Sequence, residues 1–352
     1  AVPYTELPGA VLDFLRETFM HDLREPFPID LLDEGLWSGK KVQAVAILQP
    51  ATTVHGTVTT TVVFETKGRI VIAAMQGGKL RVLHHQDNAY LREDGTTVVN
   101  GAYDPQFRYR LQGTKTLFAK GNRLVCFTGD KPSSQDIDRF NNLPMFDANS
   151  QHYYWLEGGA LERNDDLVGQ RTIGEVIPRR SLIWAGETFG FGLMYAGEWQ
   201  QAFVFDVKSA GINSTLKLER IPGQLIKATT VFSKDLAWFL VEYQDKGQSH
   251  RRCTVVNNKG DVVAETTVTD PDEDHWLYRI HGNAAVGSIL FSATDQGVVG
   301  VHVQQGSFTP TLFKDTAPFV SSDSDLLVQT EKKQIAILVI GDRQVVKLSI
   351  NQ

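Results

Sequence analysis

The sequence has few cysteines, no long apolar run and no basic block. Only two of its 352 residues are cysteine, and both Cys126 and Cys253 lie in apolar, strand-like stretches. Because a disulfide-stapled secreted domain uses more cysteines, we expect two buried free thiols. No stretch of about 18 apolar residues occurs, and the chain does not start with a basic segment followed by an apolar one. We therefore expect no membrane span and no signal peptide.

The charge balance argues against a nucleic-acid partner. The formal net charge is -6 and the pI is about 5.9, and basic residues form no run longer than a pair such as Arg179-Arg180. A nucleic-acid binder usually carries a broad basic surface, which this composition does not predict. We expect a cytoplasmic protein. The first residue, Ala1, is compatible with processing or with a piece of a larger protein or assembly.

Motifs for catalysis, cofactors and metals are also missing. The sequence has no Gly-x-Ser-x-Gly elbow, no Walker A motif and no His-Glu-x-x-His. Neither cysteine belongs to a zinc-spaced cluster, and the acidic segment 270–275 lacks the spacing of an EF-hand. We therefore predict no cofactor and no metal. The same absences favour a protein that is not an enzyme, although they leave catalysis open.

Residues 1–40 differ in pattern from residues 41–352, and we predict a boundary between them. Apolar side chains at helical spacing, among them Leu12, Leu15 and Phe19, predict an amphipathic helix from about residue 9 to 24. Two interpretations remain open for its apolar face. It packs on the main domain, or it docks a protein partner.

From residue 41 onward the pattern has a period of two and recurs as hairpins. The clearest copy is 287–303, an apolar strand, a polar turn and a second alternating strand. Similar strands are centred near Ile70, Leu124, Ile183, Ala237, Leu290 and Ile337. Their spacing, on the order of 50 residues, is close to that of one propeller blade. The count predicts six blades, or seven if one long interval holds two short blades.

On this strand period and spacing, residues 42–350 resemble the β-propeller superfamily in general. No Trp-Asp dipeptide ends a repeat, so the chain is not a clear WD40 protein. The resemblance implies an all-β ring of four-stranded blades around a channel.

Four further expectations concern the layout of this ring. A propeller closes when an N-terminal strand completes its last blade, and Val42–Leu48 is the candidate. The hairpin 287–303 is expected to supply the inner and middle strands of one blade. Residues 129–150 are expected to form a long loop, with a short helix possible within 134–141.

Two clusters are candidate ligand sites. Aromatic and acidic side chains gather at Trp184, Glu187, Glu198 and Trp199, and an acidic loop holds Asp272, Glu273 and His275. Aromatic rings with carboxylates can bind glycans, and a pair of Glu residues can hydrolyse them at the right separation. The alternative is a blade core with solvated acids. In the segment 129–150, Phe140 and Phe146 are candidates for partner contact, together with the three helix residues.

Two functional interpretations follow. The first is a non-catalytic scaffold that binds protein partners, and the alternative is a glycan-binding lectin or glycan-active enzyme. If Glu187, Glu198, Asp272, Glu273 and His275 surround one aromatic pocket, the glycan interpretation is favoured. If they are scattered, the scaffold is favoured.

Overall fold

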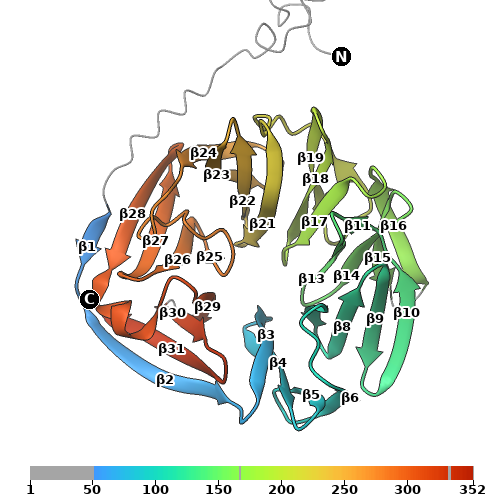
Figure 1. Cartoon of the computed structure of the whole chain (residues 1–352), viewed down its shortest axis with the longest axis horizontal. Coiled ribbons are helices and arrows are strands. Elements are labelled where there is room, and N and C mark those ends of the chain that lie inside the picture. The colour runs from blue at the N-terminus through green and yellow to red at the C-terminus, as the bar shows by residue number, and fades with distance from the viewer. Residues whose placement is uncertain (1–50, 166–167, 332–333, 352) are drawn as a thin grey trace, which may run out of the picture. The chain divides into compact units, whose positions relative to one another are not determined.

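Short apolar runs, some of them alternating with polar residues, produce mostly antiparallel strands throughout the described chain. A computed structural model describes residues 51–165, 168–331 and 334–351. In Arg123–Thr128, for example, Leu124 and Cys126 are buried between more exposed neighbours. Such strands assemble into seven sheets of four or five strands around a central channel, which is a β-propeller (Figure 1). The resemblance to this superfamily is confirmed.

Each blade is a meander whose strands run outward from the channel. Blade 1 contains β3 (Arg69–Gln76), β4 (Lys79–Gln86), β5 (Ala89–Arg92) and β6 (Thr97–Asn100). Blade 2 contains β7 (Arg108–Gln112), β8 (Lys115–Lys120), β9 (Arg123–Thr128) and β10 (Lys131–Asp136). Blade 3 contains β13 (Phe146–Ala148), β14 (Tyr153–Glu157), β15 (Ala160–Asp165) and β16 (Gly169–Glu175). Blade 4 contains β17 (Ser181–Ala185), β18 (Phe189–Ala196), β19 (Trp199–Asp206) and β20 (Ile212–Asn213).

The remaining blades draw strands from both ends of the described chain. Blade 5 contains β21 (Gln224–Phe232), β22 (Leu236–Asp245), β23 (Gln248–Asn257) and β24 (Val262–Thr269). Blade 6 contains β25 (Ala284–Val286), β26 (Ile289–Thr294), β27 (Gly297–Gln304), β28 (Ser307–Phe313) and, parallel to β28, β1 (Thr52–Val54). Blade 7 contains β29 (Asp325–Glu331), β30 (Gln334–Ile340), β31 (Gln344–Asn351) and β2 (Thr57–Glu65). A 3-10 helix, η3 (Lys314–Phe319), connects blade 6 to blade 7.

The blade number is seven, so the main count of six is wrong and the alternative is confirmed. The missed blade is blade 3, in the long interval between Leu124 and Ile183. The segment 129–150 is not one loop, because it holds β10, the two-stranded hairpin of β11 (Arg139–Phe140) and β12 (Leu143–Pro144), and the start of blade 3. Strand β10 also replaces the short helix that the sequence allowed within 134–141.

An N-terminal strand closes the ring, as expected, although the described strand is not the predicted one. Strand β2 pairs antiparallel with β31, from Thr57 opposite Asn351 to Glu65 opposite Gln344. Between β1 and β2, Asp315 accepts a hydrogen bond from the Gly56 amide at 2.8 Å. The proposed closing strand 42–48, the helix 9–24 and the boundary near residue 40 all lie outside the described residues.

The hydrophobic core lies between neighbouring blades rather than within one sheet. Trp155 and Trp238 are almost fully buried in separate clusters of this kind. Cys126 and Cys253 are buried free thiols, which confirms that prediction. First strands of neighbouring blades also contact one another, as in β3 with β7 and β13 with β17. The innermost strand of blade 6 is β25, so the hairpin 287–303 forms its second and third strands rather than its inner ones.

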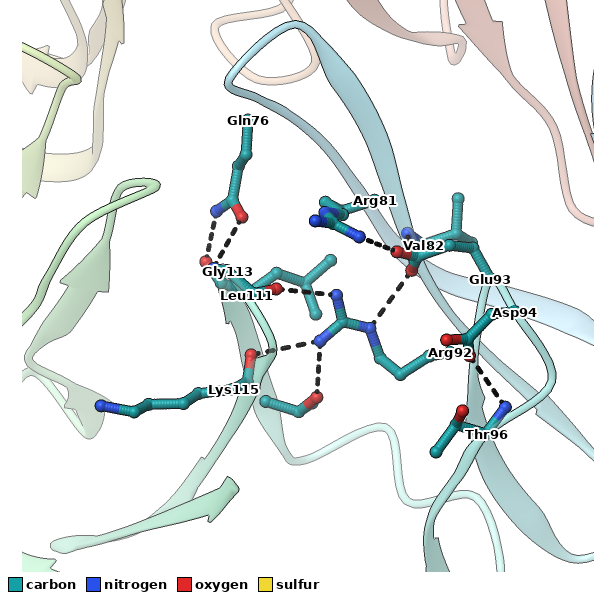
Figure 2. Close-up of polar contacts among 11 residues, drawn as sticks. Gln76, Arg81, Val82, Arg92, Glu93, Asp94, Thr96, Leu111, Gly113 and Lys115 are labelled. Atoms are coloured by element: carbon teal, nitrogen blue, oxygen red, sulfur yellow. Dashed lines mark hydrogen bonds and ion pairs between the residues drawn. The ribbon is translucent and has the colours of Figure 1, made fainter. Parts of the chain in front are cut away.

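Polar side chains add direct links between blades. The buried Gln76 of blade 1 donates to the Leu111 carbonyl of blade 2 at 2.6 Å and accepts from the Gly113 amide at 3.0 Å (Figure 2). The buried Arg92 donates from Nη2 to the Gly113 carbonyl at 3.0 Å and from Nη1 to the Thr116 hydroxyl at 3.2 Å. These bonds fix blade 1 against blade 2.

Because successive strands of a blade run in opposite directions, the turns and links lie on two different faces of the propeller. One face carries the links from the fourth strand of each blade to the first strand of the next, and also the turns between second and third strands. We call it the connecting face. Its links include 137–145, 214–223, 270–283 and 314–324. The opposite face carries the turns between first and second strands and between third and fourth strands. The two faces separate the candidate site residues.

Candidate functional site in the central channel

A cavity of about 240 Å³ lies between first strands and connections of blades 2 to 6. Its lining includes Arg108 and Arg110 from β7, Trp184 from β17 and His281 from the connection between β24 and β25. These elements belong to several blades that border the central channel of the ring (Figure 1). A cavity lined by all of them therefore belongs to that channel. This arrangement brings charged and aromatic groups from separate blades to one place.

The two arginines share a face because β7 has the period of a strand. In the sequence Arg-Tyr-Arg-Leu, Tyr109 and Leu111 are buried in the inter-blade core, whereas Arg108 and Arg110 alternate with them and line the channel. Arg110 Nε is ion-paired with Asp147 of β13, whose second oxygen accepts from the Ala185 amide at 2.9 Å. Asp147 therefore has its own structural partners.

Arg108 has a different environment. Its Nη1 donates to the Pro144 carbonyl at 2.7 Å, and its guanidinium lies 5.3 Å from the centre of the Phe146 ring. Among the described residues, no carboxylate lies within ion-pair distance of it. Burial and the positive charge of Arg110 lower the pKa of Arg108 to about 9, against the opposing attraction of Asp147, so the side chain remains charged at neutral pH. The channel thus holds a guanidinium without a carboxylate of its own, since Asp147 is ion-paired with Arg110.

His281 lies near two cations and two carboxylates. Burial and the charges of Lys227 and Arg279 lower its pKa, against the opposing attraction of Asp325 and Glu242, so its ring is neutral at neutral pH. Arg279 is paired with Asp325 at 2.8 Å, so its charge is already balanced. The cation of the cavity that lacks a carboxylate partner of its own is therefore Arg108, because Lys227 is an exposed residue of β21 that does not line the cavity.

The rest of the cavity wall is apolar. Met145, Leu182 and Trp184 are buried, while Leu143 of β12 is 44% exposed and lies on the connecting face. Trp184 packs against Phe191 and Phe239, at ring separations of 6.2 and 5.7 Å. The site therefore combines an apolar wall with a cationic one.

The structure separates the acidic residues that the sequence put forward. Glu187 is on the opposite face, in the turn before β18, and accepts from the Ser150 amide at 3.0 Å. Glu198 lies on the connecting face in the turn after β18, with its side chain 92% exposed and 3.5 Å from Arg220. The two therefore stand at opposite ends of one strand.

Asp272, Glu273 and His275 lie in the connection between blades 5 and 6, on the connecting face. His275 Nδ1 accepts from the Leu277 amide at 3.0 Å, and its ring stacks on Trp276. Burial lowers the pKa of His275. These contacts give His275 a role in holding its own loop. None of the three lines the channel cavity.

Among the predicted aromatic residues that the structure describes, only Trp199 has a large exposed surface. It is the first residue of β19, on the connecting face, and is 49% exposed. Phe140 and Phe146 are buried, the first against Tyr195 and the second beneath Arg108. The helix residues Leu12, Leu15 and Phe19 lie outside the described chain. The proposed roles of all these residues stay predictions.

Sequence reasoning missed Arg108, Arg110, Asp147 and His281. One signal was available, because two arginines at period two in a short strand must share a face. Nothing in the sequence shows that this face meets β13 and β17. Across the described part of the chain, no group of three or more His, Cys, Asp or Glu residues is placed to hold a metal ion.

A second cavity, of about 330 Å³, lies between blades 4 and 5 near Phe205, Asp206 and Asn258. Its acidic residue is already used, because Asp206 accepts from the backbone amides of Lys208 and Ser209. It shows no convergence of charged groups comparable with that of the channel. In the portion described, no helix is long and apolar enough to cross a membrane.

The chain was compared with family models, curated protein sequences and solved structures, and only the solved structures match it. No family model and no curated protein sequence matches the chain. Among solved structures, the WD40 domain of Pan2 from Neurospora crassa is similar over 86% of this chain and 98% of that one, with 9% identity and a TM-score of 0.46. The CNH domain of AfRom2 is similar over 84% of this chain and 100% of that one, with 10% identity and a TM-score of 0.42. TolB from Acinetobacter baumannii is similar over 83% of this chain and 66% of that one, with 11% identity and a TM-score of 0.36.

Proposed function

We propose that this propeller is a non-catalytic protein-interaction module that docks a partner on its connecting face. The observation that carries the proposal is the position of its exposed aromatic residues. Trp199, which is 49% exposed, and Phe319, which is 40% exposed, both lie on this face. The exposed Leu143 and Ile226 lie there as well, at the end of the channel.

Other exposed apolar residues are aliphatic and scattered. Val168 is on the opposite face, and Val62, Val63 and Val262 are on the outer strands β2 and β24. Single exposed aliphatic side chains are common on soluble proteins and require no ligand. Aromatic residues and arginine are the types enriched at protein interfaces. The connecting face carries both, since Arg108 lies in the channel below it.

The glycan alternative has less support from the geometry. A sugar-binding cleft needs its carboxylates and aromatic rings on one surface, and Glu187 and Glu198 lie on opposite faces. Trp184 is buried among phenylalanines, so its ring face is not open to a sugar. We therefore favour a protein partner.

The test is partner capture with surface variants. A Trp199→Ser and Phe319→Ser double variant is compared with a Val168→Ser and Val62→Ser double variant, which removes apolar surface elsewhere. Both are used as bait in extracts of cells that naturally contain the protein, and bound proteins are identified by mass spectrometry. We expect the first variant to lose partners that the wild type and the second retain. Recovery of one unchanged set by all three baits would refute docking on this face.

A further inference from the structure

The channel cavity has the chemistry of a binding site rather than of a packing defect. A charged side chain away from bulk water is costly unless a counter-charge and hydrogen bonds compensate it. Arg108 has one backbone acceptor and one aromatic ring, and its neighbour Arg110 adds like charge. The ring therefore holds a guanidinium in a position that an anion would stabilise.

The charge of this site is opposite to that of the whole chain. The protein carries a formal net charge of -6, whereas Arg108, which lines the cavity, is left without an ion-pair partner among the residues described. A local reversal of sign concentrates anions at the place where it occurs. The planar guanidinium is suited to a carboxylate, which it can bind through two hydrogen bonds.

The apolar wall restricts the ligand further. Leu182 and Trp184 form a buried surface next to the arginines, and Leu143 stands at the mouth. Leu143 belongs to the β11–β12 hairpin, whose turn residues Asn141 and Asn142 both have positive φ, so the hairpin turns tightly there. A cavity of about 240 Å³ accommodates side chains rather than a folded surface. An anion attached to an apolar group fits both walls.

We propose that the channel cavity binds an acidic peptide segment of a protein partner, with an Asp or Glu carboxylate on Arg108 and a neighbouring large apolar side chain against the exposed Leu143 at the mouth. This inference rests on the proposed function, because the cavity faces the surface on which the partner docks. It predicts that the partner contains an acidic residue next to a large apolar residue.

The test selects peptides without knowledge of the partner. A phage-displayed random dodecapeptide library is panned on the wild-type protein, and selected peptides are synthesised with a fluorescent label. Their affinity is measured by fluorescence anisotropy against wild type, Arg108→Gln and Arg123→Gln. Arg123 is an exposed residue of β9 in the same blade, so its variant removes equal charge far from the cavity. Folding of each variant is checked by thermal unfolding.

We expect the selected peptides to contain Asp or Glu next to a large apolar residue. Arg108→Gln should weaken their binding about 10- to 100-fold, the usual effect of losing a charged hydrogen bond, and Arg123→Gln should leave it unchanged. Replacing the acid of the peptide by its amide should cause a similar loss. A second variant, Leu143→Asp, places a carboxylate at the exposed mouth and should also weaken binding.

Selected peptides without acidic residues would overturn the inference, and so would equal binding by wild type and Arg108→Gln. A phosphoserine peptide that binds at least about tenfold tighter than its Asp counterpart would also overturn the carboxylate assignment, since a phosphate would then be the better match for the arginine. If Trp199→Ser with Phe319→Ser loses natural partners but Arg108→Gln does not, the cavity proposal alone fails. If neither variant loses partners, the docking face itself is wrong.

Discussion

Two arginines in neighbouring blades show how differently this fold uses one residue type. Arg92 of blade 1 is buried, and all three of its side-chain nitrogens donate hydrogen bonds (Figure 2). One of its acceptors is Glu93, which Arg81 also binds at 2.7 Å. Arg108 of blade 2 makes one hydrogen bond to a carbonyl and has no carboxylate partner in the described chain. The first links two blades, whereas the second faces a cavity.

The difference separates structural charge from charge that is available for binding. A buried arginine with complete partners contributes to specificity of packing, and its removal leaves those partners unpaired. An arginine without a carboxylate partner of its own contributes less to stability and is free to bind an anion. Stability and binding measurements on matched variants can therefore test whether Arg92 and Arg108 belong to different classes.

The largest effect is expected for Arg92→Met. This change keeps the length of the side chain but removes the hydrogen bonds that Arg92 donates to the Gly113 and Lys115 carbonyls, the Thr116 hydroxyl and Glu93. We expect the free energy of unfolding to fall by about 3 kcal/mol. Urea unfolding measures it, with Arg123→Met as the exposed control, for which a change within about 0.5 kcal/mol is expected. An equally small change for Arg92→Met would show that the buried arginine does not hold the blades.

Gln76→Leu tests whether such a link needs charge. Gln76 bonds both the Leu111 carbonyl and the Gly113 amide, and leucine removes both bonds while filling similar space. We expect a loss of about 2 kcal/mol in urea unfolding, because two buried backbone groups lose their partners. Gln106→Leu, at an exposed position, is the control. A loss below about 0.5 kcal/mol would mean that water replaces the side chain.

The fold could be predicted from the sequence only where strands are long. In β22 and β26–β27 the runs of buried, mostly apolar residues are clear, and the spacing of such strands predicted a propeller. Blade 3 was missed because β13 has only three residues and follows two-residue strands in the hairpin before it. These pieces are strands because neighbours pair with them, and that pairing is not visible in their own sequence.

The closing strand and the channel site depended on contacts between distant residues. The stretches 42–48 and 57–65 both have the composition of a strand, and only pairing with β31 identifies the second as the one that completes blade 7. Arg108 and Arg110 could be assigned to one face from their spacing. Their different partners, Asp147 for one and a carbonyl for the other, follow from how β7 meets β13 and the hairpin.

The pH dependence of stability should also distinguish a paired arginine. Burial raises the pKa of Glu93, but hydrogen bonds from Arg81, the Val82 amide and Arg92 outweigh it, and the pKa lies below its ordinary value of 4.5. Glu93 therefore stabilises the fold above about pH 4.5, and this contribution is lost as the pH falls through the folded-state pKa. Because Arg92→Met raises that pKa, we expect its deficit against wild type to narrow by about 1 kcal/mol between about pH 7 and pH 3. Urea midpoints at both pH values measure the deficit, and a constant deficit would contradict the link.

The smallest effect on stability is expected for Arg108→Gln, which is also the variant with the largest expected effect on binding. It removes one hydrogen bond to the Pro144 carbonyl and the contact with the Phe146 ring. It also removes the cost of burying the charge and the repulsion from Arg110, the two causes that lower the pKa of Arg108. These contributions have opposite signs, so we expect the free energy of unfolding to change by less than about 0.5 kcal/mol. A loss of about 2 kcal/mol or more in urea unfolding would place Arg108 in the same class as Arg92, as a link between structural elements, and would remove the physical reason for expecting an anion in the channel.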